Sequence, residues 1–432
     1  MEAQTRRNWL FTTSPLSRNS QRSDVGNLLK MKQVFLIGLF AVGVAACGSS
    51  TTEISTGPGT TAPPATPPVA PVAVADGPLK LSSELIADGL STPVAVVAEP
   101  GTDRLFVVEQ TGRIVIVDNG AVLDEPYIDL AEDITTEGLE QGLLGFALHP
   151  DYANNGRSFV YFTDTAGNSQ LLEYSRSSIT SAQFEKTVLR QDQPHQYHNG
   201  GQLIFGPDGY LYLTFGDGGG ISDQFQNAQN ADTLLGGIVR LDIDSGDPYA
   251  IPPDNPFAQG GGAPELFLMG LRNPWRIAFD VATDELYVTD VGQEGWEEVN
   301  VLALSTAGGT NFGWPIVEGP QCYEAESCDR TGLAEPTIPI FHEYICSLIG
   351  GPVYFGDALP ELWGHYVYGD FCIGWVRTLK MVDGEATQLR SWESDLGRLG
   401  MITSFGVDNN GEILVINAEG ELRRIIRAPV ES

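Results

Sequence analysis

A histidine followed by small and polar residues is the first candidate for chemistry in this sequence. His198 precedes Asn199, Gly200 and Gly201, directly before an apolar run that is typical of a strand from about Gln202. An imidazole titrates near neutral pH, so we interpret His198 as a general base. The glycines would let the backbone approach a bound group closely. The alternative is a histidine that caps a tight turn.

Two further segments place polar side chains directly before apolar runs. Arg272 and Asn273 precede Pro274, and together they offer a forked cation and an amide to a ligand that carries a carboxylate. Glu140 and Gln141 come just before another strand and could add an oxygen to the same site. Side chains that only brace a loop or form a salt bridge are the alternative for the Arg-Asn pair.

Another candidate segment is a loop rich in glycine and glutamate. Gly292, Gln293 and Gly295 provide flexible backbone whose carbonyls can turn inward. Three glutamates lie beside them: Glu294, Glu297 and Glu298. Calcium prefers hard oxygen ligands, including backbone carbonyls, so the loop is a candidate calcium site. A solvated acidic loop is the alternative.

Other chemistry-bearing residues match no catalytic pattern. No nucleophile elbow, dinucleotide fingerprint or phosphate loop is present, and the glycine run at residues 216–220 does not match GxGxxG. The remaining histidines give no signal of a site: His149, His195, His342 and His365. Three tryptophans could offer flat faces to a ring, although core packing is their default role: Trp275, Trp296 and Trp314.

One pattern recurs six times from about residue 81 onward: an apolar strand, a turn, and a second strand rich in Tyr, Val, Phe and Thr. The second strands are expected to begin near Leu105, Phe159, Leu211, Leu286, Tyr366 and Ile413. Alternating apolar residues with turn pairs such as Asp-Gly and Asn-Gly indicate antiparallel hairpins. The sequence therefore predicts an all-β fold, a six-bladed β-propeller, rather than a jelly roll or sandwich. Two long insertions, near 220–265 and 293–340, are expected to form the walls of a funnel at one end.

The composition restricts the partners. The 432 residues include 56 acidic and 24 basic side chains, a formal net charge of −32. Such a surface repels phosphate backbones and anionic lipid head groups, so we expect no nucleic acid as a partner. Fifty glycines and 27 prolines favour short strands with many turns over a helical bundle.

The amino terminus resembles a targeting signal. Residues 1–46 form an extension and a signal peptide, in which Lys32 precedes an apolar run at 34–46 that is too short to span a bilayer comfortably. Small residues lead to Cys47, a pattern that resembles a bacterial lipoprotein signal whose cysteine is lipidated. An ordinary secretory signal is the alternative.

The predicted signal also indicates the domain organisation and the location of the protein. Residues 47–78 are a flexible tether rich in Ser, Thr and Pro, and residues 79–432 are the propeller. We expect the protein to lie outside the cytoplasm, on the periplasmic or cell-surface side of a bacterial outer membrane, and to contact the membrane by its lipid anchor only.

Four more cysteines agree with an oxidising compartment. They allow three pairings, of which we favour Cys322 with Cys328 and Cys346 with Cys372. A zinc site is the rival interpretation, but no CxxC spacing or nearby pair of histidines supports it.

Together these segments resemble the glucose/sorbosone dehydrogenase family of six-bladed quinoprotein propellers. The matching stretches are, in chain order, GLLGFALHPDY, HNGGQLIFGPDGYLYLTFGDGG, LLGGIVRLDI, GLRNPWRIAFD, GQEGWEEVN and GGTNFGWPIVEG. The stretch GPVYFGDALPELWGHYVYGDFC looks more like the branch that includes Hedgehog-interacting-protein-like propellers.

The resemblance implies a pyrroloquinoline quinone (PQQ) site assisted by calcium, and a small sugar as substrate. By motif, His198 matches the base that takes the hydroxyl proton while hydride passes to the quinone. Arg272 and Asn273 match residues that contact the cofactor. Gly292 and Gln293 match the pair whose backbone oxygens hold the calcium. The quinone would carry the redox chemistry while protein and metal orient it.

The sequence departs from the family pattern at two places. Glu140 stands where soluble glucose dehydrogenases have glutamine. Phe371 and Cys372 stand where the resemblance implies a lysine, and Arg398 has no second arginine nearby. Two alternatives to a sugar dehydrogenase therefore remain. One is a non-catalytic propeller that binds carbohydrate or protein, and the other is a calcium-dependent hydrolase of the lactonase type.

Overall fold

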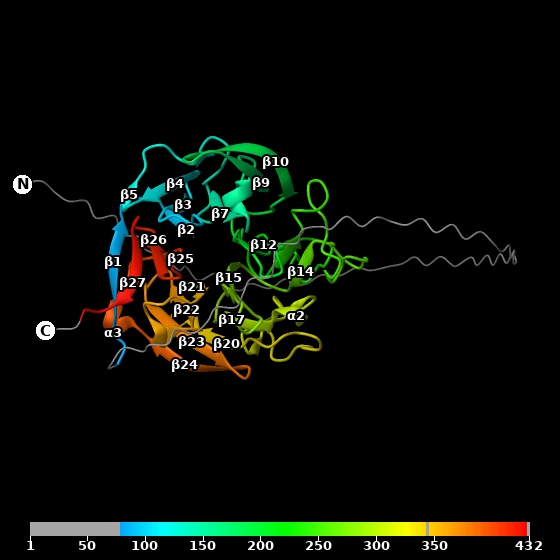
Figure 1. Cartoon of the computed structure of the whole chain (residues 1–432). Coiled ribbons are helices and arrows are strands. Elements are labelled where there is room, and N and C mark those ends of the chain that lie inside the picture. Colours follow the sequence, from blue (N-terminus) through cyan, green and yellow to red (C-terminus); the bar gives the residue numbers. More distant parts are fainter. Residues whose placement is uncertain (1–77, 343–344, 430–432) are drawn as a thin grey trace, which may run out of the picture. The chain divides into compact units, whose positions relative to one another are not determined.

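The computed structural model describes residues 78–342 and 345–429, which form a six-bladed β-propeller (Figure 1). The predicted signal peptide, the cysteine at 47 and the tether up to residue 77 lie outside the described residues. Within the described residues, no helix has the length and apolar character needed to cross a membrane. The predicted all-β propeller is confirmed.

Each blade is one antiparallel sheet whose strands follow one another from the axis outward. Blade 1 contains β2 (Pro93–Ala98), β3 (Leu105–Glu109), β4 (Arg113–Asp118), β5 (Ala121–Val122) and β6 (Ile128–Asp129). Blade 2 contains β7 (Leu143–Leu148), β8 (Arg157–Thr163), β9 (Ser169–Ser178) and β10 (Ser181–Gln191). Blade 3 contains β11 (Leu203–Phe205), β12 (Leu211–Phe215), β13 (Gly237–Leu241) and β14 (Leu266–Met269).

The second half of the chain repeats this order. Blade 4 contains β15 (Pro274–Asp280), β16 (Glu285–Asp290), β17 (Trp296–Ala303) and β20 (Ile338–Phe341). Blade 5 contains β21 (Leu348–Val353), β22 (Tyr366–Asp370), β23 (Val376–Val382) and β24 (Glu385–Ser391). Blade 6 contains β25 (Ile402–Val407), β26 (Ile413–Asn417), β27 (Leu422–Arg427) and β1 (Leu81–Ala87).

Short elements lie between the strands. They are α1 (Tyr152–Asn155), α2 (Leu304–Ala307), α3 (Glu393–Leu396), the 3-10 helix η2 (Pro360–Leu362), and a small hairpin of β18 (Val317–Glu318) and β19 (Gln321–Cys322). The predicted starts of the second strands agree with β3, β8, β12, β16, β22 and β26 to within two residues.

The ring is closed by the first strand of the chain. β1 pairs with β27 as the outermost strand of blade 6, with Leu81 opposite Arg427, so blue and red ribbons lie side by side in Figure 1. Both ends of the propeller therefore contribute to one sheet. Pulling either end away would expose the edge of β26 or β27.

The hydrophobic core is divided into six clusters, each between two adjacent blades of the described chain. Between blades 2 and 3, for example, Tyr161 and Phe215 pack edge to face with their ring centroids 5.7 Å apart. Successive side chains along each strand point to opposite faces of the blade. Because both faces of each blade are covered by a neighbouring blade, most residues of the strands are apolar.

The antiparallel order gives the propeller two different ends. The innermost strands all begin at one end, which we call the upper end, and the loops from second to third strands lie there too. The first predicted insertion is divided by β13: residues 216–236 lie at the upper end, whereas residues 242–265 lie at the opposite end. The prediction that the whole insertion walls one funnel is therefore wrong for its second half. Regular antiparallel pairing sends the chain to the other end after β13.

Candidate functional site

His198 lies at the upper end, five residues before the start of β11, and is almost fully buried. Its backbone is in the left-handed region with φ of 59°, which is rare for a residue with a side chain. Its backbone N–H donates to Glu140 Oε2 at 2.6 Å, and its Nδ1 lies 2.7 Å from Asp217 Oδ1. Strained backbone of this kind is held by its surroundings, often at a functional site.

Asp217 is completely buried and holds the imidazole in one state. Its Oδ1 also accepts the backbone N–H of Gly219 at 2.8 Å, and its Oδ2 accepts the indole N–H of Trp314 at 2.8 Å. Because an ionised carboxylate only accepts hydrogen bonds, the proton of a neutral imidazole must be on Nδ1. His198 Nε2 has no hydrogen-bond partner among the described residues and is left free to accept a proton.

In the five other blades, the polar residue that ends the second strand binds the backbone where the chain enters the innermost strand of that blade. Glu109 accepts the N–H of Ser91, and Asp370 accepts those of Cys346 and Ser347. Thr163 and Asp290 accept backbone N–H groups in the same way in blades 2 and 4, whereas Asn417 in blade 6 donates from its side-chain amide to the Leu399 carbonyl.

In blade 3 this contact comes from Thr214, one residue before the end of β12. Its Oγ1 accepts the backbone N–H of Gly201 and of Gln202, each at 3.1 Å. Asp217 lies two residues beyond the end of β12, and its carboxylate binds the imidazole of His198.

Glu140 joins two of the predicted site segments. Its Oε2 accepts the backbone N–H of His198 and, at 3.1 Å, the side-chain amide of Asn273. Asn273 in turn accepts the N–H of Gly200 at 3.1 Å. The structure therefore brings Glu140, His198 and Asn273 together, from loops of blades 2, 3 and 4.

Gln141 has a different environment. Its side-chain oxygen accepts the N–H of Gly138 at 2.9 Å, so it stabilises its own loop, and its backbone carbonyl accepts from Gln110. Of the two residues predicted to add an oxygen to the site, only Glu140 contacts the other site residues.

The structure shows a packing role for the glycines. A Cβ at Gly200 would lie 2.7 Å from the Thr214 carbonyl oxygen, and one at Gly201 would lie 2.7 Å from the Tyr161 ring. These glycines allow close packing of the protein against itself. That they also let the backbone approach a bound group stays a prediction.

Arg272 has one guanidinium nitrogen available for a ligand. Its Nη1 donates to the Val291 carbonyl at 2.8 Å, its Nε lies 3.5 Å from Gln293 Oε1, and the guanidinium lies over the Trp314 ring at 5.7 Å. Its Nη2 has no hydrogen-bond partner among the described residues. The backbone N–H groups of Arg272 and Asn273 are held by Asp290, whose pKa is raised well above its usual range by burial.

The predicted calcium loop is folded around Glu318. Glu318 Oε1 accepts the backbone N–H of Gln293 at 2.7 Å, of Glu294 at 2.8 Å and of Gly295 at 3.2 Å. In a trans peptide the preceding carbonyl points opposite to the N–H. The carbonyls of Gly292 and Gln293 thus point away from Glu318, and neither accepts a hydrogen bond from the described residues.

The glutamates beside this loop are not solvated. Glu297 and Glu298 lie on β17 rather than in the loop, and Glu297 has no exposed surface. Burial raises the pKa of Glu297, whereas its contact with His342 opposes that shift and raises the pKa of His342. The alternative of a solvated acidic loop is therefore wrong for these two residues. They point to opposite faces of the strand, where Glu297 accepts from Leu348 and Glu298 accepts from Gly319.

The second insertion contributes residues whose role the sequence did not reveal. Trp314 and Glu318 both come from the connection between β17 and β20, and they hold Asp217 and the Gly292–Gln293 backbone. Trp314 was recognised only as a possible flat face. Asp217 belongs to the glycine run that matches no nucleotide motif. No local pattern distinguishes these residues, because their partners lie far away in sequence.

The two other tryptophans lie elsewhere. Trp275 donates from its indole N–H to the Thr403 carbonyl at 3.0 Å, and Trp296 packs edge to face against Phe341 with centroids 5.2 Å apart. His149 is held in its turn by Asp244, as expected of a structural residue.

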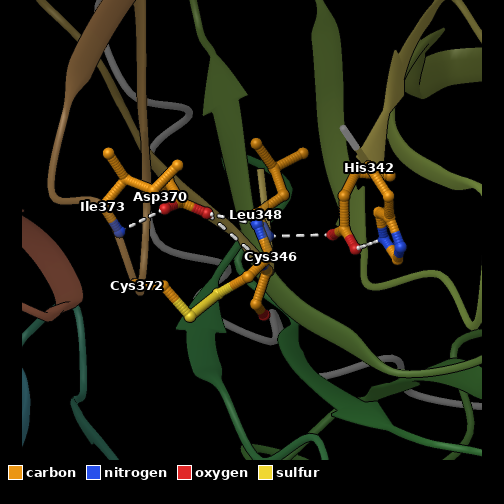
Figure 2. Close-up of a disulfide and its surroundings, with 8 residues drawn as sticks. His342, Cys346, Leu348, Asp370, Cys372 and Ile373 are labelled. Carbon is orange, nitrogen blue, oxygen red and sulfur yellow. Dashed lines mark hydrogen bonds and ion pairs between the residues drawn. A yellow bond between two sulfur atoms is a disulfide. The ribbon is translucent and has the colours of Figure 1, made fainter. Parts of the chain in front are cut away.

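Both predicted disulfides are present: Cys322–Cys328 and Cys346–Cys372. Figure 2 shows the second, which joins the residues just before β21 to the loop after β22, next to Asp370, whose carboxylate accepts the Cys346 N–H. Cys372 is thus engaged where the resemblance implies a lysine. Arg398 is 68% exposed and lies 3.5 Å from Glu393, so it belongs to the surface.

Several polar atoms near His198 lack partners. Gln193 Oε1, His195 Nδ1 and Asn199 Oδ1 are buried without a hydrogen bond among the described residues. Buried polar atoms without partners are rare and indicate a bound water or ligand. Together with His198 Nε2, Arg272 Nη2 and the two free carbonyls, this donor and acceptor set fits a polar ligand such as PQQ with calcium.

The residues present restrict how calcium and PQQ could each be held. Among residues 78–342 and 345–429, no three His, Cys, Asp or Glu side chains converge to hold a metal ion, so calcium would depend on backbone oxygens and the ligand. Arg272 is the one guanidinium within this cluster to oppose the carboxylates of PQQ.

The profile of a family described as Glucose / Sorbosone dehydrogenase matches residues 90–426. The chain is 30% identical to the Hedgehog-interacting protein of Homo sapiens over 372 residues, covering 77% of this chain and 49% of that protein. It is 29% identical over 299 residues to the aldose sugar dehydrogenase YliI of Escherichia coli K12, covering 66% and 76%. It spans between about half and three-fifths of the length of several curated relatives.

Solved structures share the fold. The PQQ-bound form of an aldose sugar dehydrogenase from Streptomyces coelicolor superposes with a TM-score of 0.65 at 22% identity, covering 81% of this chain and 99% of that one.

Proposed function

Because this chain belongs to the glucose/sorbosone dehydrogenase family, we propose that it oxidises a sugar, an aldose or a related polyol or aldehyde, with PQQ and calcium outside the cytoplasm. The observation that carries this proposal is the contact between Asp217 and His198. Asp217 is completely buried just beyond β12, and it orients an imidazole whose second nitrogen has no hydrogen-bond partner among the described residues.

His198 would remove the proton from the hydroxyl group of the substrate. The Asp217 carboxylate keeps Nε2 unprotonated in the neutral imidazole and stabilises the imidazolium that forms when Nε2 takes the proton. Trp314 donates to the other oxygen of Asp217 and prevents the carboxylate from rotating away. When bound, PQQ supplies the acceptor for the hydride.

The other site residues would orient the cofactor and the metal. Arg272 Nη2 is available to a carboxylate of the ligand, and the outward carbonyls of Gly292 and Gln293 are available to calcium. Glu140 holds the His198 and Asn273 segments together rather than facing the ligand with both oxygens. With one cation at the site, calcium must balance most of the ligand charge, so cofactor binding should depend strongly on calcium.

The experiment is dye reduction by the purified protein with PQQ and calcium, over a panel of aldoses and sugar alcohols. Activity should require both additions and be lost in His198→Ala. The control is His365→Gln, because His365 is buried at the opposite end, where it contacts Gln388. Equal activity of His198→Ala and wild type would contradict the proposed base.

A second candidate is a non-catalytic binding propeller, and one observation favours it. Cys372 is locked in a disulfide at the loop where the resemblance implies a cofactor-binding lysine, and a relative carries the name Hedgehog-interacting protein. Titration of PQQ with calcium separates the two candidates. Failure of PQQ to bind at micromolar concentration would leave the binding propeller as the better explanation.

The location is part of the same proposal. Two disulfides support a compartment outside the cytoplasm, and the sequence around Cys47 supports a lipid anchor. Labelling of cells with a radioactive fatty acid should mark the wild-type protein and not Cys47→Ala.

A further inference from the structure

A tryptophan and an arginine from β15 reach across the axis of the propeller. Arg276 starts in blade 4, and its Nη2 donates to the Val94 carbonyl in blade 1 on the opposite side of the ring. Its Nε donates to Ser404 Oγ in blade 6 at 2.9 Å, and Trp275 Nε1 donates to the Thr403 carbonyl. The guanidinium lies over the Trp275 ring at 4.3 Å. These contacts close the axial channel below the residues of the His198 site.

Arg276 is a buried cation without a counter-charge. It is 4% exposed, and each hydrogen bond of its guanidinium goes to a neutral oxygen: Ser404 Oγ, the Trp275 carbonyl and the Val94 carbonyl. Two of its five N–H groups therefore have no partner among the described residues. Burial lowers its pKa to about 9, and no carboxylate contributes an opposing effect.

This lack of a counter-charge is unusual in so acidic a chain. Arg240 is buried to the same extent, yet it contacts both Asp208 and Asp254. A buried charge with no partner costs several kcal/mol. None of the acidic residues within 78–342 and 345–429 forms an ion pair with Arg276 or raises its pKa.

A cavity of about 480 Å³ lies on the far side of Arg276 from His198. It is lined by the later residues of the innermost strands of all six blades, from β2, β7, β11, β15, β21 and β25. Each of these strands is hydrogen-bonded on one side only, so its free edge presents backbone N–H and C=O groups to the channel. The Gln202 side chain binds the backbone N–H and C=O of Ile277 at this edge. The cavity thus combines one cation with the inner edges of six strands.

The other charged residue that lines the cavity is neutralised. Asp408 lies 3.0 Å from Arg424 and accepts the backbone N–H of Asn410 and Glu412. Arg276 therefore sets the sign of the potential inside the cavity.

We propose that this cavity binds a small monovalent anion, a halide or a small carboxylate, against the guanidinium of Arg276. The anion supplies the missing counter-charge and accepts the two free N–H groups. The site is independent of the proposed sugar oxidation, because it lies beyond the Trp275–Arg276 layer and shares no residue with the His198 site.

The test measures the melting temperature Tm of the intact protein while sodium bromide replaces the sodium salt of the bulky buffer anion MES. Total sodium stays constant, so general salt screening is unchanged. Bromide should raise Tm by about 2 °C or more as its concentration passes well beyond its dissociation constant. The rise should disappear in Arg276→Gln and persist in Arg276→Lys.

Arg240→Gln is the matched control, since it removes a buried arginine that already has carboxylate partners. It should retain the bromide-dependent rise from its own lower starting Tm. Equal responses of wild type and Arg276→Gln would overturn the proposal.

A second measurement tests the proposal on the wild-type protein, in case Arg276→Gln does not fold. Crystals of the wild-type protein with bromide should show an anomalous peak in contact with the Arg276 guanidinium. An axial cavity without a bromide peak would overturn the proposal, whatever the behaviour of the variant.

Discussion

Asp217 lies two residues beyond the end of β12 in blade 3, Asp370 is the last residue of β22 in blade 5, and the two aspartates bind different partners. Asp370 accepts the backbone N–H groups of Cys346 and Ser347, whereas Asp217 accepts the imidazole of His198 and the indole of Trp314. A buried aspartate near the end of a second strand thus holds backbone in blade 5 and orients the candidate base in blade 3.

Because the partners differ, replacing each aspartate by asparagine should affect different properties of the protein. Asp217→Asn presents an amide that can donate to Nδ1 and so favours the imidazole with its proton on Nε2. The rate kcat of sugar oxidation should fall about 10²- to 10⁴-fold with little change in Tm. Asp370→Asn should lower Tm through weaker capping and leave kcat within a few-fold of wild type. Steady-state kinetics and thermal unfolding check both, and similar kcat losses in the two variants would contradict the assignment.

The glycines of the calcium loop predict a second contrast. A Cβ at Gly292 would lie 1.7 Å from the Trp296 carbonyl oxygen, whereas one at Gly295 would meet only Glu318 Oε2 at 3.6 Å. Gly292→Ala should therefore displace the loop and raise the calcium concentration needed for activation at least tenfold. Gly295→Ala should stay near the wild-type value. Calcium titrations of dye reduction measure this, and an unchanged Gly292→Ala would count against the predicted metal ligands.

The disulfides should contribute unequally to stability. Cys346–Cys372 closes a loop of 26 residues and Cys322–Cys328 a loop of 6. Chain entropy predicts a loss of about 3 kcal/mol for the double serine variant of the first pair and about 2 kcal/mol for the second. Denaturant unfolding measures both free energies. The reverse order would show that native contacts, rather than loop closure, dominate their effect.

Asp223 predicts a pH dependence of stability. It lies in the upper connection at residues 216–236 and is 3% exposed, and burial raises its pKa from 3.8 to about 6. A carboxyl group whose pKa is higher in the folded state stabilises most when protonated, so its contribution is lost as pH rises through about 6.

Relative to Asp223→Asn, the wild-type protein should therefore lose about 2 kcal/mol of unfolding free energy between pH 4.5 and pH 7. Denaturant unfolding at several pH values gives this difference. Asp232→Asn, an exposed acid in the same connection, is the control and should show no such slope. A flat difference for Asp223→Asn would mean that Asp223 is ionised throughout this range.

Much of the architecture was predictable from the local pattern. The period of apolar residues and the turn pairs locate the six hairpins, because both signals arise from neighbours in the chain. The disulfide pairing was also predictable, since the two pairs are close in sequence. The division of the first insertion was not, because the short strand Gly237–Leu241 carries too weak a pattern to stand out within it.

The sequence by itself determined the family, the six-bladed propeller and the residues His198, Arg272 and Asn273, since short runs around each of them carry a recognisable pattern. Only the tertiary structure decided that Asp217 is the partner of His198, that Glu318 turns the Gly292 and Gln293 carbonyls outward, and that Arg276 crosses the axis. These contacts join residues 19 to 182 positions apart. Which of 56 acids meets a given base is therefore set by how the blades pack around the axis, and no local pattern records it.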